Sequence, residues 1–531
     1  MIKGIKKVLI SDPLSSTGLD ILGKAKNLKC DIKPGLSPEE LIKIIPEYDA
    51  IIVRSETKLG SKIIEAADRL KVIGRAGIGL DNVDLPAATK KGIVVMNTPQ
   101  ENAIAAAEHT IAMMLSISRR IPQATASLKG GKWEKKRFMG VELYNKVLGI
   151  VGIGVIGTVV ADRARALKMK VISYDPYISK EAAEKKGIEL VSFDEVLEKS
   201  DFITVHTPLT DETRNLINKD TFRKMKDGVI VINCARGGII AEKDLYDAIK
   251  EGKVAGAALD VFEKEPATGN PLFELDEVIG TPHLGASTGE AQENVAVAIA
   301  QQVIDFLVTG EARNAVNLPM VNPDILPFLN PFLRLGEKLG SFLAQISNYA
   351  IEEVVIEYHG EVIEYGIRPI TTSVLKGLLT PFLGETVNFV NAPIIAKERG
   401  VKVTESTLSK AEDFASLIAI TTRSKMEENY IAGALFGKKE LRIVRLNDFL
   451  IEALPEGHIL LINNYDKPGV IGNIGLALAK RDINIATMQF GRDRMGGNAI
   501  SLLHLDTPLP PGVLGEILRL PNIISVRQIE L

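Results

Sequence analysis

The 531-residue sequence contains few cysteines and no long apolar run. Cys30 and Cys234 are its only cysteines, and neither has the spacing of a metal site, so we expect no bound metal and a reducing, cytoplasmic setting. No uninterrupted apolar stretch approaches the ~18 residues of a membrane helix. The N-terminus lacks the apolar segment and the small-residue cleavage site of a signal peptide. These absences predict a cytoplasmic protein without a membrane partner.

The sequence also lacks a large excess of charge of either sign. A formal net charge of −3 gives no reason to expect nucleic acid or a membrane surface as a partner. A hydrophobic content of 46% and a charged content of 25% are those of a folded soluble protein. With about 150 residues per domain as a guide, the length predicts three or four domains.

The stretch from Lys146 to Asp175 is typical of a strand, a helix and a second strand that bind a dinucleotide. An apolar run leads into the motif Gly152-x-Gly154-x-x-Gly157. These glycines permit a tight turn, a close approach of the pyrophosphate and close packing of the helix on the sheet. Asp175 is placed to bind the adenosine ribose, and no Arg follows it closely, which favours NAD over NADP. The alternative is an ordinary βαβ turn in which Asp175 caps the next helix.

Alternating strand and helix patterns surround this stretch. From Lys7 to about Asn97 they predict a second, smaller parallel α/β unit. From Val147 onward, six strands follow the scheme of a doubly wound dinucleotide-binding domain. Between the two units, the basic stretch 121–140 holds the only tryptophan, Trp133, and we expect a loop that contacts another subunit or a ligand.

The C-terminal part of the chain reads differently. A helical segment at 287–308 is followed by a proline-rich boundary at 314–331. The region 331–455 mixes a helix with alternating strands and holds no catalytic constellation; its His359 is expected to be structural. The last segment has the β-α-β-β-α-β order of a ferredoxin-like module, which by itself indicates no function.

Three motifs that follow strands of the nucleotide-binding unit contain residues suited to oxidising a hydroxy acid. They are NCARGG, LDVFEKEP and TPHLGAST, and they contain Arg236, Glu265 and His283. Arg236 can bind a carboxylate in a bidentate manner. His283 can accept a proton near neutrality, with Glu265 holding its other ring nitrogen. Taken singly, each residue has an ordinary structural explanation, and His206 is a rival base without an accompanying Arg or acid.

Two arginines stand at the carboxyl ends of predicted strands in the smaller N-terminal unit. Arg54 and Arg75 follow apolar runs, and ligands collect at the carboxyl ends of strands in open parallel sheets. Both side chains are therefore expected to face a crevice. The alternative is a pair of solvated surface arginines.

With these residues in view, the chain resembles the D-2-hydroxyacid dehydrogenase family, and within it the long form that carries an intervening domain and an ACT domain. The resemblance covers essentially the whole length. It rests on a series of long motifs in the family's order: VRSETK, GRAGIGLDNVD, IPQATASLKGGKW, GIVGIGVIG, HTPLTDETRNLI, NCARGG, ALDVFEKEP and PHLGAST.

The resemblance implies an α/β architecture. A Rossmann-type doubly wound parallel sheet and a smaller flavodoxin-like substrate domain are expected, followed by an α+β intervening domain and a ferredoxin-like ACT domain. The expected limits are 1–100 with 287–319 for the discontinuous substrate domain, 101–286 for the NAD-binding domain, 320–455 for the intervening domain and 456–531 for the regulatory ACT domain.

The family's functional residues carry over to matching positions. His283 is the expected acid/base, Glu265 its partner and Arg236 the residue that binds and polarises the substrate. NAD contacts are expected at Gly152, Gly154, Val155, Ile156, Gly157, Asp175, Thr207, Cys234, Ala235, Arg236, Asp260 and His283. Substrate contacts are expected at Arg54, Ser55, Arg75, Asn102, Trp133 and Lys136, the last two reaching a neighbouring subunit's site, and effector contacts at Asn464, Asp466 and Asn484.

Two positions depart from the family pattern. Val155 stands where Arg is usual, which removes one charged contact to the pyrophosphate, and Ile78 stands where some members have Thr. Both departures affect cofactor affinity and leave the expected chemistry intact.

The resemblance implies NAD-dependent oxidation of 3-phospho-D-glycerate to 3-phosphooxypyruvate in serine synthesis, with serine as a feedback inhibitor and a homotetrameric assembly. Two alternatives stay open. One is a dehydrogenase for an unphosphorylated acid such as glyoxylate or hydroxypyruvate, against which Arg54 and Arg75 together argue. The other is a nucleotide- and amino-acid-sensing regulator without turnover, against which the intact set of Arg236, Glu265 and His283 argues.

Overall fold

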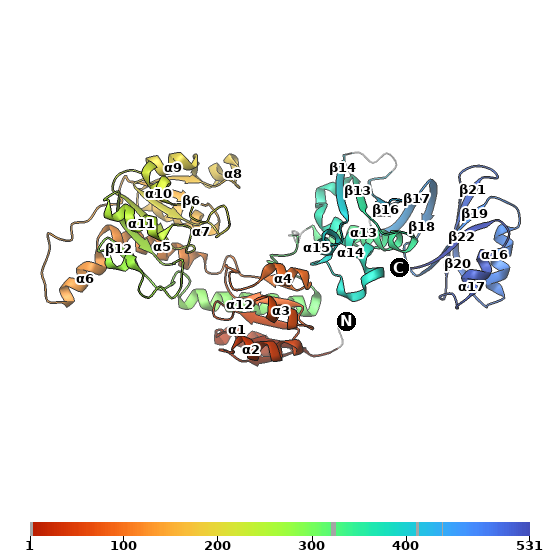
Figure 1. Cartoon of the computed structure of the whole chain (residues 1–531), viewed down its shortest axis with the longest axis horizontal. Coiled ribbons are helices and arrows are strands. Elements are labelled where there is room, and N and C mark those ends of the chain that lie inside the picture. Colours follow the sequence, from red (N-terminus) through yellow and green to blue (C-terminus); the bar gives the residue numbers. More distant parts are fainter. Residues whose placement is uncertain (1–3, 320–324, 410–413, 438) are drawn as a thin grey trace.

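The computed structural model describes residues 4–319, 325–409, 414–437 and 439–531, and their strands form four separate sheets. Figure 1 shows the sheets along an elongated molecule, with the second sheet at one end and the fourth at the other. No helix of the described residues is long and apolar enough to cross a membrane.

The first sheet is parallel and has the order β2-β1-β3-β4-β5, as expected of a flavodoxin-like unit. Its strands are β1 (Lys6–Ile10), β2 (Leu28–Ile32), β3 (Ala50–Val53), β4 (Val72–Arg75) and β5 (Val94–Met96). Its helices are α1 (Ser16–Lys24), α2 (Pro38–Ile44), η1 (Ile45–Glu47), α3 (Ser61–Ala66) and α4 (Leu85–Lys90).

A helix from much later in the chain completes this unit. α12 (Gly289–Thr309) packs against α1 and β4, and its side chains Ile299 and Val303 are buried in the same core as Val8 and Ile52. The first structural unit is therefore built from two separate parts of the chain.

The second sheet is parallel and has the order β12-β11-β10-β9-β6-β7-β8, which confirms the Rossmann-type expectation. Its strands are β6 (Val147–Val151), β7 (Lys170–Tyr174), β8 (Glu189–Leu190), β9 (Phe202–Val205), β10 (Val229–Asn233), β11 (Val254–Leu259) and β12 (Val278–Gly280). Its helices are α5 (Ala103–Ser118), α6 (Ile121–Lys129), α7 (Val155–Ala166), α8 (Lys180–Lys185), α9 (Phe193–Lys199), α10 (Lys219–Lys224), α11 (Glu242–Lys250) and η2 (Pro271–Glu274).

Two details of this unit differ from the prediction. The sheet has a seventh strand, β8, whose two residues pair only with β7 at the edge and are too short to leave a sequence pattern. Residues Ile121–Lys129 form helix α6 instead of a loop, because Pro122 lies in the first turn, where its fixed φ favours a helix start.

The third sheet is mixed and has the order β14-β13-β15-β16-β17-β18. Its strands are β13 (Glu353–Gly360), β14 (Lys402–Leu408), β15 (Ser416–Arg423), β16 (Glu428–Phe436), β17 (Glu440–Leu446) and β18 (Phe449–Ala453). Its helices are α13 (Leu326–Ile346), η3 (Glu361–Tyr365), α14 (Arg368–Leu383), η4 (Gly384–Thr386) and α15 (Ala392–Glu398).

The fourth sheet is antiparallel with the order β20-β21-β19-β22. Its elements are β19 (His458–Tyr465), α16 (Val470–Ala479), β20 (Ile485–Arg492), β21 (Asn498–Leu505), α17 (Val513–Leu518) and β22 (Ile523–Glu530), in the predicted β-α-β-β-α-β order.

The third and fourth sheets share one hydrophobic core. Along β19 the side chains alternate: Leu460 and Ile462 face the core under α16 and α17, whereas Ile459 and Leu461 join the core of α13 and the third sheet. Period-two alternation thus gives this sheet two buried faces. The C-terminal module is packed against its neighbour rather than tethered by a free linker.

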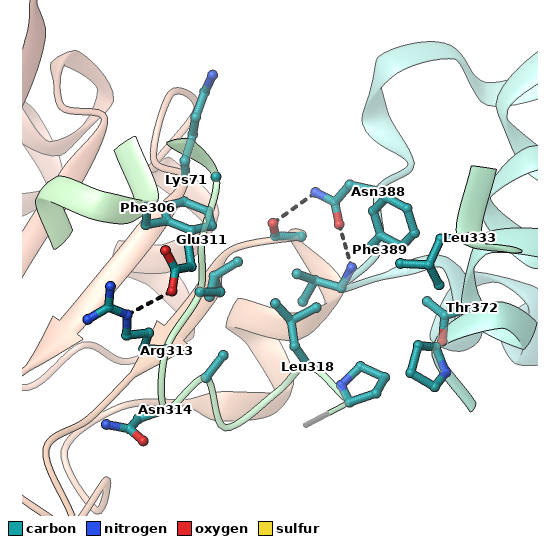
Figure 2. A pocket seen from close by; sticks show the side chains of 18 of the residues that line it. Lys71, Phe306, Glu311, Arg313, Asn314, Leu318, Leu333, Thr372, Asn388 and Phe389 are labelled. Carbon is teal, nitrogen blue, oxygen red and sulfur yellow. Dashed lines mark hydrogen bonds and ion pairs between the residues drawn. The ribbon is translucent and has the colours of Figure 1, made fainter. Parts of the chain in front are cut away.

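The first and third units meet at a crevice of about 1070 Å³. Figure 2 shows Phe306 and Leu318 on one side and Leu333 and Phe389 on the other. At one edge the side-chain amide of Asn388 donates to the carbonyl oxygen of Gly92 at 2.9 Å. None of the residues that we expected in the active site lines this crevice.

A close crossing of α13 and α14 generates a stability prediction. A methyl group on Gly377 of α14 would overlap the backbone carbonyl oxygen of Glu337 on α13. Gly377→Ala should therefore force the helices apart and lower the free energy of unfolding by about 1–3 kcal/mol or more. Denaturant unfolding of the full chain measures this, with Gly472→Ala of α16 as the control, since nothing lies within 4 Å of its added methyl group. A Gly377→Ala chain as stable as the control would contradict the packing described.

Candidate active site

The carboxyl ends of three neighbouring strands present the three residues expected to carry the chemistry. Arg236 follows β10, Glu265 follows β11 and His283 follows β12. His283 Nδ1 lies 2.9 Å from Glu265 Oε2, and both side chains are partly exposed. The other carboxylate oxygen, Oε1, accepts from the backbone N–H of Phe262 at 3.2 Å, which fixes the carboxylate. The sheet thus presents an imidazole oriented by an acid.

The loop that carries His283 is folded around Asp260. His283 has a left-handed backbone with φ of 56°, and its N–H donates to the Asp260 carbonyl oxygen at 2.9 Å. The Asp260 carboxylate accepts from the N–H groups of Leu284 at 2.7 Å and Gly285 at 2.8 Å. Burial alone would raise the pKa of Asp260, but its hydrogen bonds with His109, Thr281 and the Leu284 amide outweigh burial and lower that pKa. Asp260 therefore remains a carboxylate beneath the loop.

Arg236 reaches from the second unit to the first. Its Nε lies 2.9 Å from Asp81 Oδ2, and its Nη1 donates to the carbonyl oxygen of Ala235 at 2.6 Å. Arg75, at the end of β4, is close by: burial, then the positive charges of Arg236 and Arg54, lower its pKa to about 10. Nε of Arg75 is buried without a partner among the described residues. Three cations thus lie near two carboxylates, Asp81 and Asp12, and this excess of positive charge is suited to an anionic ligand.

Two glycines of the motif GRAGIGLDNVD make room for these guanidinium groups. A methyl group on Gly77 would overlap Nη1 of Arg75, and one on Gly79 would overlap Nη2 of Arg236. The loop is held by Thr98, whose hydroxyl accepts from the Gly77 N–H at 2.8 Å. The motif therefore positions arginine side chains.

Asp12 orders the segment that carries Arg54 and Ser55. Its carboxylate accepts from the N–H of Arg54 at 2.5 Å, from the N–H of Thr57 at 3.1 Å and from the Thr57 hydroxyl at 2.5 Å. The Asn82 side-chain amide stabilises the same segment by donating to the Arg54 carbonyl oxygen at 2.7 Å. The backbone that presents Arg54 is thus fixed by side chains that precede and follow it in sequence.

Asn102 and Thr207 each carry an orphaned polar atom. Oδ1 of Asn102 and Oγ1 of Thr207 are buried without a hydrogen-bond partner among the described residues. Buried polar atoms are rarely left unpaired in the absence of a ligand or water. Both residues were expected to contact ligands, Asn102 the substrate and Thr207 the cofactor.

The turn between β6 and α7 fits a pyrophosphate. Gly152 has φ of 95°, and a methyl group there would lie 2.9 Å from the carbonyl oxygen of His206. Gly154 opens onto free space at the start of α7, where the helix amides face outward. Val155 follows as the first helical residue with a side chain 48% exposed, so the position where Arg is usual lies at the open rim.

Asp175 holds this turn from the end of β7. Its Oδ2 accepts from the N–H of Ile153 at 2.8 Å and its Oδ1 from the N–H of Tyr177 at 2.9 Å. A carboxylate accepts several hydrogen bonds, so both oxygens retain capacity for ribose hydroxyls. Together with the orphaned Thr207 hydroxyl, this arrangement fits NAD.

Two buried groups beside the cofactor turn are poorly suited to proton transfer at neutral pH. Burial lowers the pKa of His206 to about 4, and its Nε2 lies 3.1 Å from the Thr204 hydroxyl. Burial, and next the charge of Asp260, raise the pKa of Cys234 to about 12. His206 is therefore neutral and Cys234 a thiol, which leaves His283 as the better candidate base.

Other expected site residues lie apart from the group around Arg236 and His283. Trp133, 83% exposed, and Lys136 lie on the arm of residues 121–144, which leaves the second unit beyond α6 (Figure 1). In the fourth sheet, Asp466 follows β19 and accepts from Gly496 N–H at 3.0 Å, while Asn484 precedes β20 and donates to Asp506 at 2.8 Å. Asn464 is buried within β19. Among the described residues, no cluster of His, Cys, Asp and Glu side chains is placed to hold a metal.

Sequence reasoning missed three residues that shape the site: Asp12, Asp81 and His109. The signal for Asp81 was present, since it lies in GLDNVD. Asp12 and His109 act on segments more than 40 residues away in sequence, at Arg54 and Thr281, so no local pattern reveals them.

Comparison with known proteins identifies two regions. Residues 111–285 match the family described as D-isomer specific 2-hydroxyacid dehydrogenase, NAD binding domain. Residues 328–447 match the family described as D-3-phosphoglycerate dehydrogenase intervening domain.

Relatives are similar over nearly the whole chain. A D-3-phosphoglycerate dehydrogenase of Archaeoglobus fulgidus is 47% identical over 528 residues, which cover 99% of this chain and 100% of the relative. One from Synechocystis sp. is 47% identical, covering 99% of this chain and 95% of the relative. The crystal structure of an NAD+-bound 3-phosphoglycerate dehydrogenase of Entamoeba histolytica covers 60% of this chain and 100% of its own, with a TM-score of 0.51 and 31% identity.

Proposed function

Because the chain belongs to the D-3-phosphoglycerate dehydrogenase family of the D-isomer specific 2-hydroxyacid dehydrogenases, we propose that it oxidises 3-phospho-D-glycerate to 3-phosphooxypyruvate, the first step of serine synthesis. Membership of this family makes it an NAD-dependent oxidoreductase. The observation that carries the substrate proposal is the cluster of Arg54, Arg75 and Arg236, whose positive charges act on one another. Arg236 follows the strand next to the one that precedes Glu265, and Glu265 lies 2.9 Å from His283.

In the proposed reaction His283 accepts the proton of the C2 hydroxyl. Since the Glu265 carboxylate can only accept, Nδ1 of His283 carries the hydrogen between them and Nε2 is left as the acceptor. Glu265 also stabilises the imidazolium that forms as the proton arrives. NAD, when bound, supplies the acceptor for the hydride that leaves C2.

The arginines bind the two anionic groups of the substrate. Arg236 takes the carboxylate in a bidentate contact and polarises the oxygen at C2, which requires release of its ion pair with Asp81. Arg54, Ser55 and the Nε of Arg75 take the phosphate. An unphosphorylated acid would leave this second group of donors unpaired, which is why we favour the phosphorylated substrate.

The residues that we propose to hold NAD follow the carboxyl ends of strands of the second sheet. The Gly152–Gly157 turn with Val155 and Ile156 would take the pyrophosphate, and Asp175 the ribose. The remaining proposed contacts follow β9, β10, β11 and β12 and include Thr207, Cys234, Ala235, Arg236, Asp260 and His283.

The domain limits expected from the sequence are retained as part of the proposal. They are 1–100 with 287–319 for substrate, 101–286 for NAD, 320–455 for the intervening domain and 456–531 for the ACT domain. The packing of α12 on the first sheet supports the discontinuous substrate domain.

A second copy of the chain is proposed to cover the arm. Four large apolar side chains are exposed there: Leu128, Trp133, Met139 and Tyr144. Exposure of such a group to water is unfavourable. This arrangement supports contact of Trp133 and Lys136 with a neighbouring subunit, within the homotetramer that the resemblance implies.

Serine is proposed as an inhibitor bound between two C-terminal modules. Asp466 and Asn484 lie at opposite ends of the sheet: Tyr465 pairs with Asn498 at one end of β21, and Ile485 with Leu505 at the other. At about 3.3 Å per residue this strand separates the two ends by roughly 23 Å. One serine can reach both groups only if two copies pair head to tail, with Asn464 buried beside Asp466.

The substrate proposal is tested by NADH production. The native chain should turn over 3-phospho-D-glycerate with a much higher kcat/KM than D-glycerate. Arg54→Gln should lower kcat/KM for the phosphorylated substrate about 10- to 100-fold, the worth of a charge-assisted hydrogen bond of about 1.5–3 kcal/mol, with little change for D-glycerate. Equal use of both acids would indicate a dehydrogenase for unphosphorylated substrates, and no NADH with either would indicate a regulator without turnover.

The role of His283 is tested separately. His283→Ala should lower kcat by about 10²- to 10⁴-fold, the usual contribution of a general base, while NAD binding measured by fluorescence should weaken far less. The matched control is His359→Ala, since His359 lies in β13 of the third sheet, outside the proposed active site. Near-native turnover of the His283 variant would refute the assignment.

Serine control has its own prediction. Asn484→Ala and Asp466→Ala should each abolish inhibition by serine, because each copy contributes one half of every site. Mixing the two variants, with exchange of subunits, should restore part of the inhibition. In each mixed pair one of the two serine sites keeps both native residues. Native activity unaffected by serine would remove this proposal and leave the catalytic one in place.

A further inference from the structure

The chain contains a hydrogen-bond relay that begins on helix α5, outside the residues assigned above. Nε2 of His109 lies 3.0 Å from the hydroxyl oxygen of Thr281, and that hydroxyl donates to Oδ1 of Asp260 at 2.6 Å. Since the Thr281 hydrogen points to the carboxylate, its oxygen is an acceptor for His109. His109 therefore carries its hydrogen on Nε2, which also lies 3.3 Å from Asp260 Oδ1.

The relay ends on the carboxylate that holds the His283 loop. Asp260 is 1% exposed and uses both oxygens, accepting from Leu284 and Gly285 as well as from Thr281. Between these anchored residues, His283 keeps its left-handed backbone, a conformation that persists only where its surroundings enforce it. The direction of the imidazole depends on this loop.

His109 has a distinct place among the contacts of Asp260. Among the described residues it is the one basic side chain within ion-pair distance of this buried carboxylate. A buried carboxylate needs hydrogen bonds or a partner charge, so removal of His109 leaves Asp260 and Thr281 underpaired. The helix is fixed against the sheet, since α5 packs on β10, β11 and β12.

We propose that His109 is a positioning residue of the reaction: through Thr281 and Asp260 it fixes the loop that aims His283 at the substrate. The inference rests on the proposed function, because it takes His283 as the base. It adds a residue that touches neither the substrate nor NAD, and it assigns the Nε2–H group of His109 as the functional part.

The test compares two replacements of His109. His109→Leu keeps apolar bulk without a donor and should lower kcat about 10- to 100-fold, since small misplacements of a reacting group have effects of this size. The midpoint of thermal unfolding should fall, because Asp260 and Thr281 lose a partner, whereas NAD affinity should change far less than kcat. His109→Gln places an amide N–H at nearly the same reach and should recover most of kcat. Glu108→Gln is the matched control, because this neighbour on α5 is paired with Arg163 at 3.2 Å, away from the loop.

A double-mutant comparison tests whether His109 acts through Thr281. Thr281→Val removes the middle of the relay, so His109→Leu added to it should lower kcat little further. If His109→Leu fails to fold, His109→Asn, whose amide is too short to reach Thr281, takes its place in the same comparison.

The outcomes separate this inference from the proposed function. Native kcat in the Leu variant, equal damage by Gln and Leu, or fully additive losses with Thr281→Val would each overturn the relay. If at the same time His283→Ala abolishes turnover, the base assignment stands alone. Near-native turnover of His283→Ala would remove the base assignment and the relay together.

Discussion

The ion pair between Arg236 and Asp81 joins the two parallel units at the proposed substrate site. Arg236 follows a strand of the second sheet and Asp81 belongs to the first unit. Arg54 and Arg75 add two further cations. Burial, and then the positive charges of Arg236 and Arg54, lower the pKa of Arg75. The carboxylates of Asp81 and Asp12 offset only part of this charge. An anionic ligand is attracted by the remainder, and the arginines that attract it come from both parallel units.

The first and second units each use a buried carboxylate to fix a loop through backbone N–H groups. Asp12 holds the segment of Arg54, and Asp260 holds the loop of His283. Each carboxylate gathers several donors, which lowers the freedom of a segment that has no regular secondary structure. A guanidinium or imidazole on such a segment is held in place before substrate arrives, so less ordering remains to be paid for on binding.

Much of this arrangement could be predicted from the sequence, because parallel sheets place the ends of successive strands along one edge. The residues Arg236, Glu265 and His283 were found in this way, and the glycine turn by its motif. The two-residue strand β8 was too short to leave a pattern. Asp12 and His109 could not be recognised, because their roles depend on side-chain contacts between segments that are far apart in sequence. Asp81 lies in a recognised motif, but its partner Arg236 is 155 residues away. The separation of Asp466 from Asn484 likewise requires the register of β21.

The C-terminal half of the described chain contacts the first unit as one packed body. The fourth sheet shares its core with α13 and the third sheet through Ile459 and Leu461, so the two move as one packed body. That body touches the first unit at Asn388 and Gly92, beside the crevice drawn in Figure 2. The first unit in turn carries Arg54 and Arg75. The Asn388–Gly92 contact lies at the amino end of β5, whereas Arg54 and Arg75 lie at the carboxyl ends of β3 and β4. Because these strands are parallel, the C-terminal body and the two arginines meet opposite edges of the first sheet.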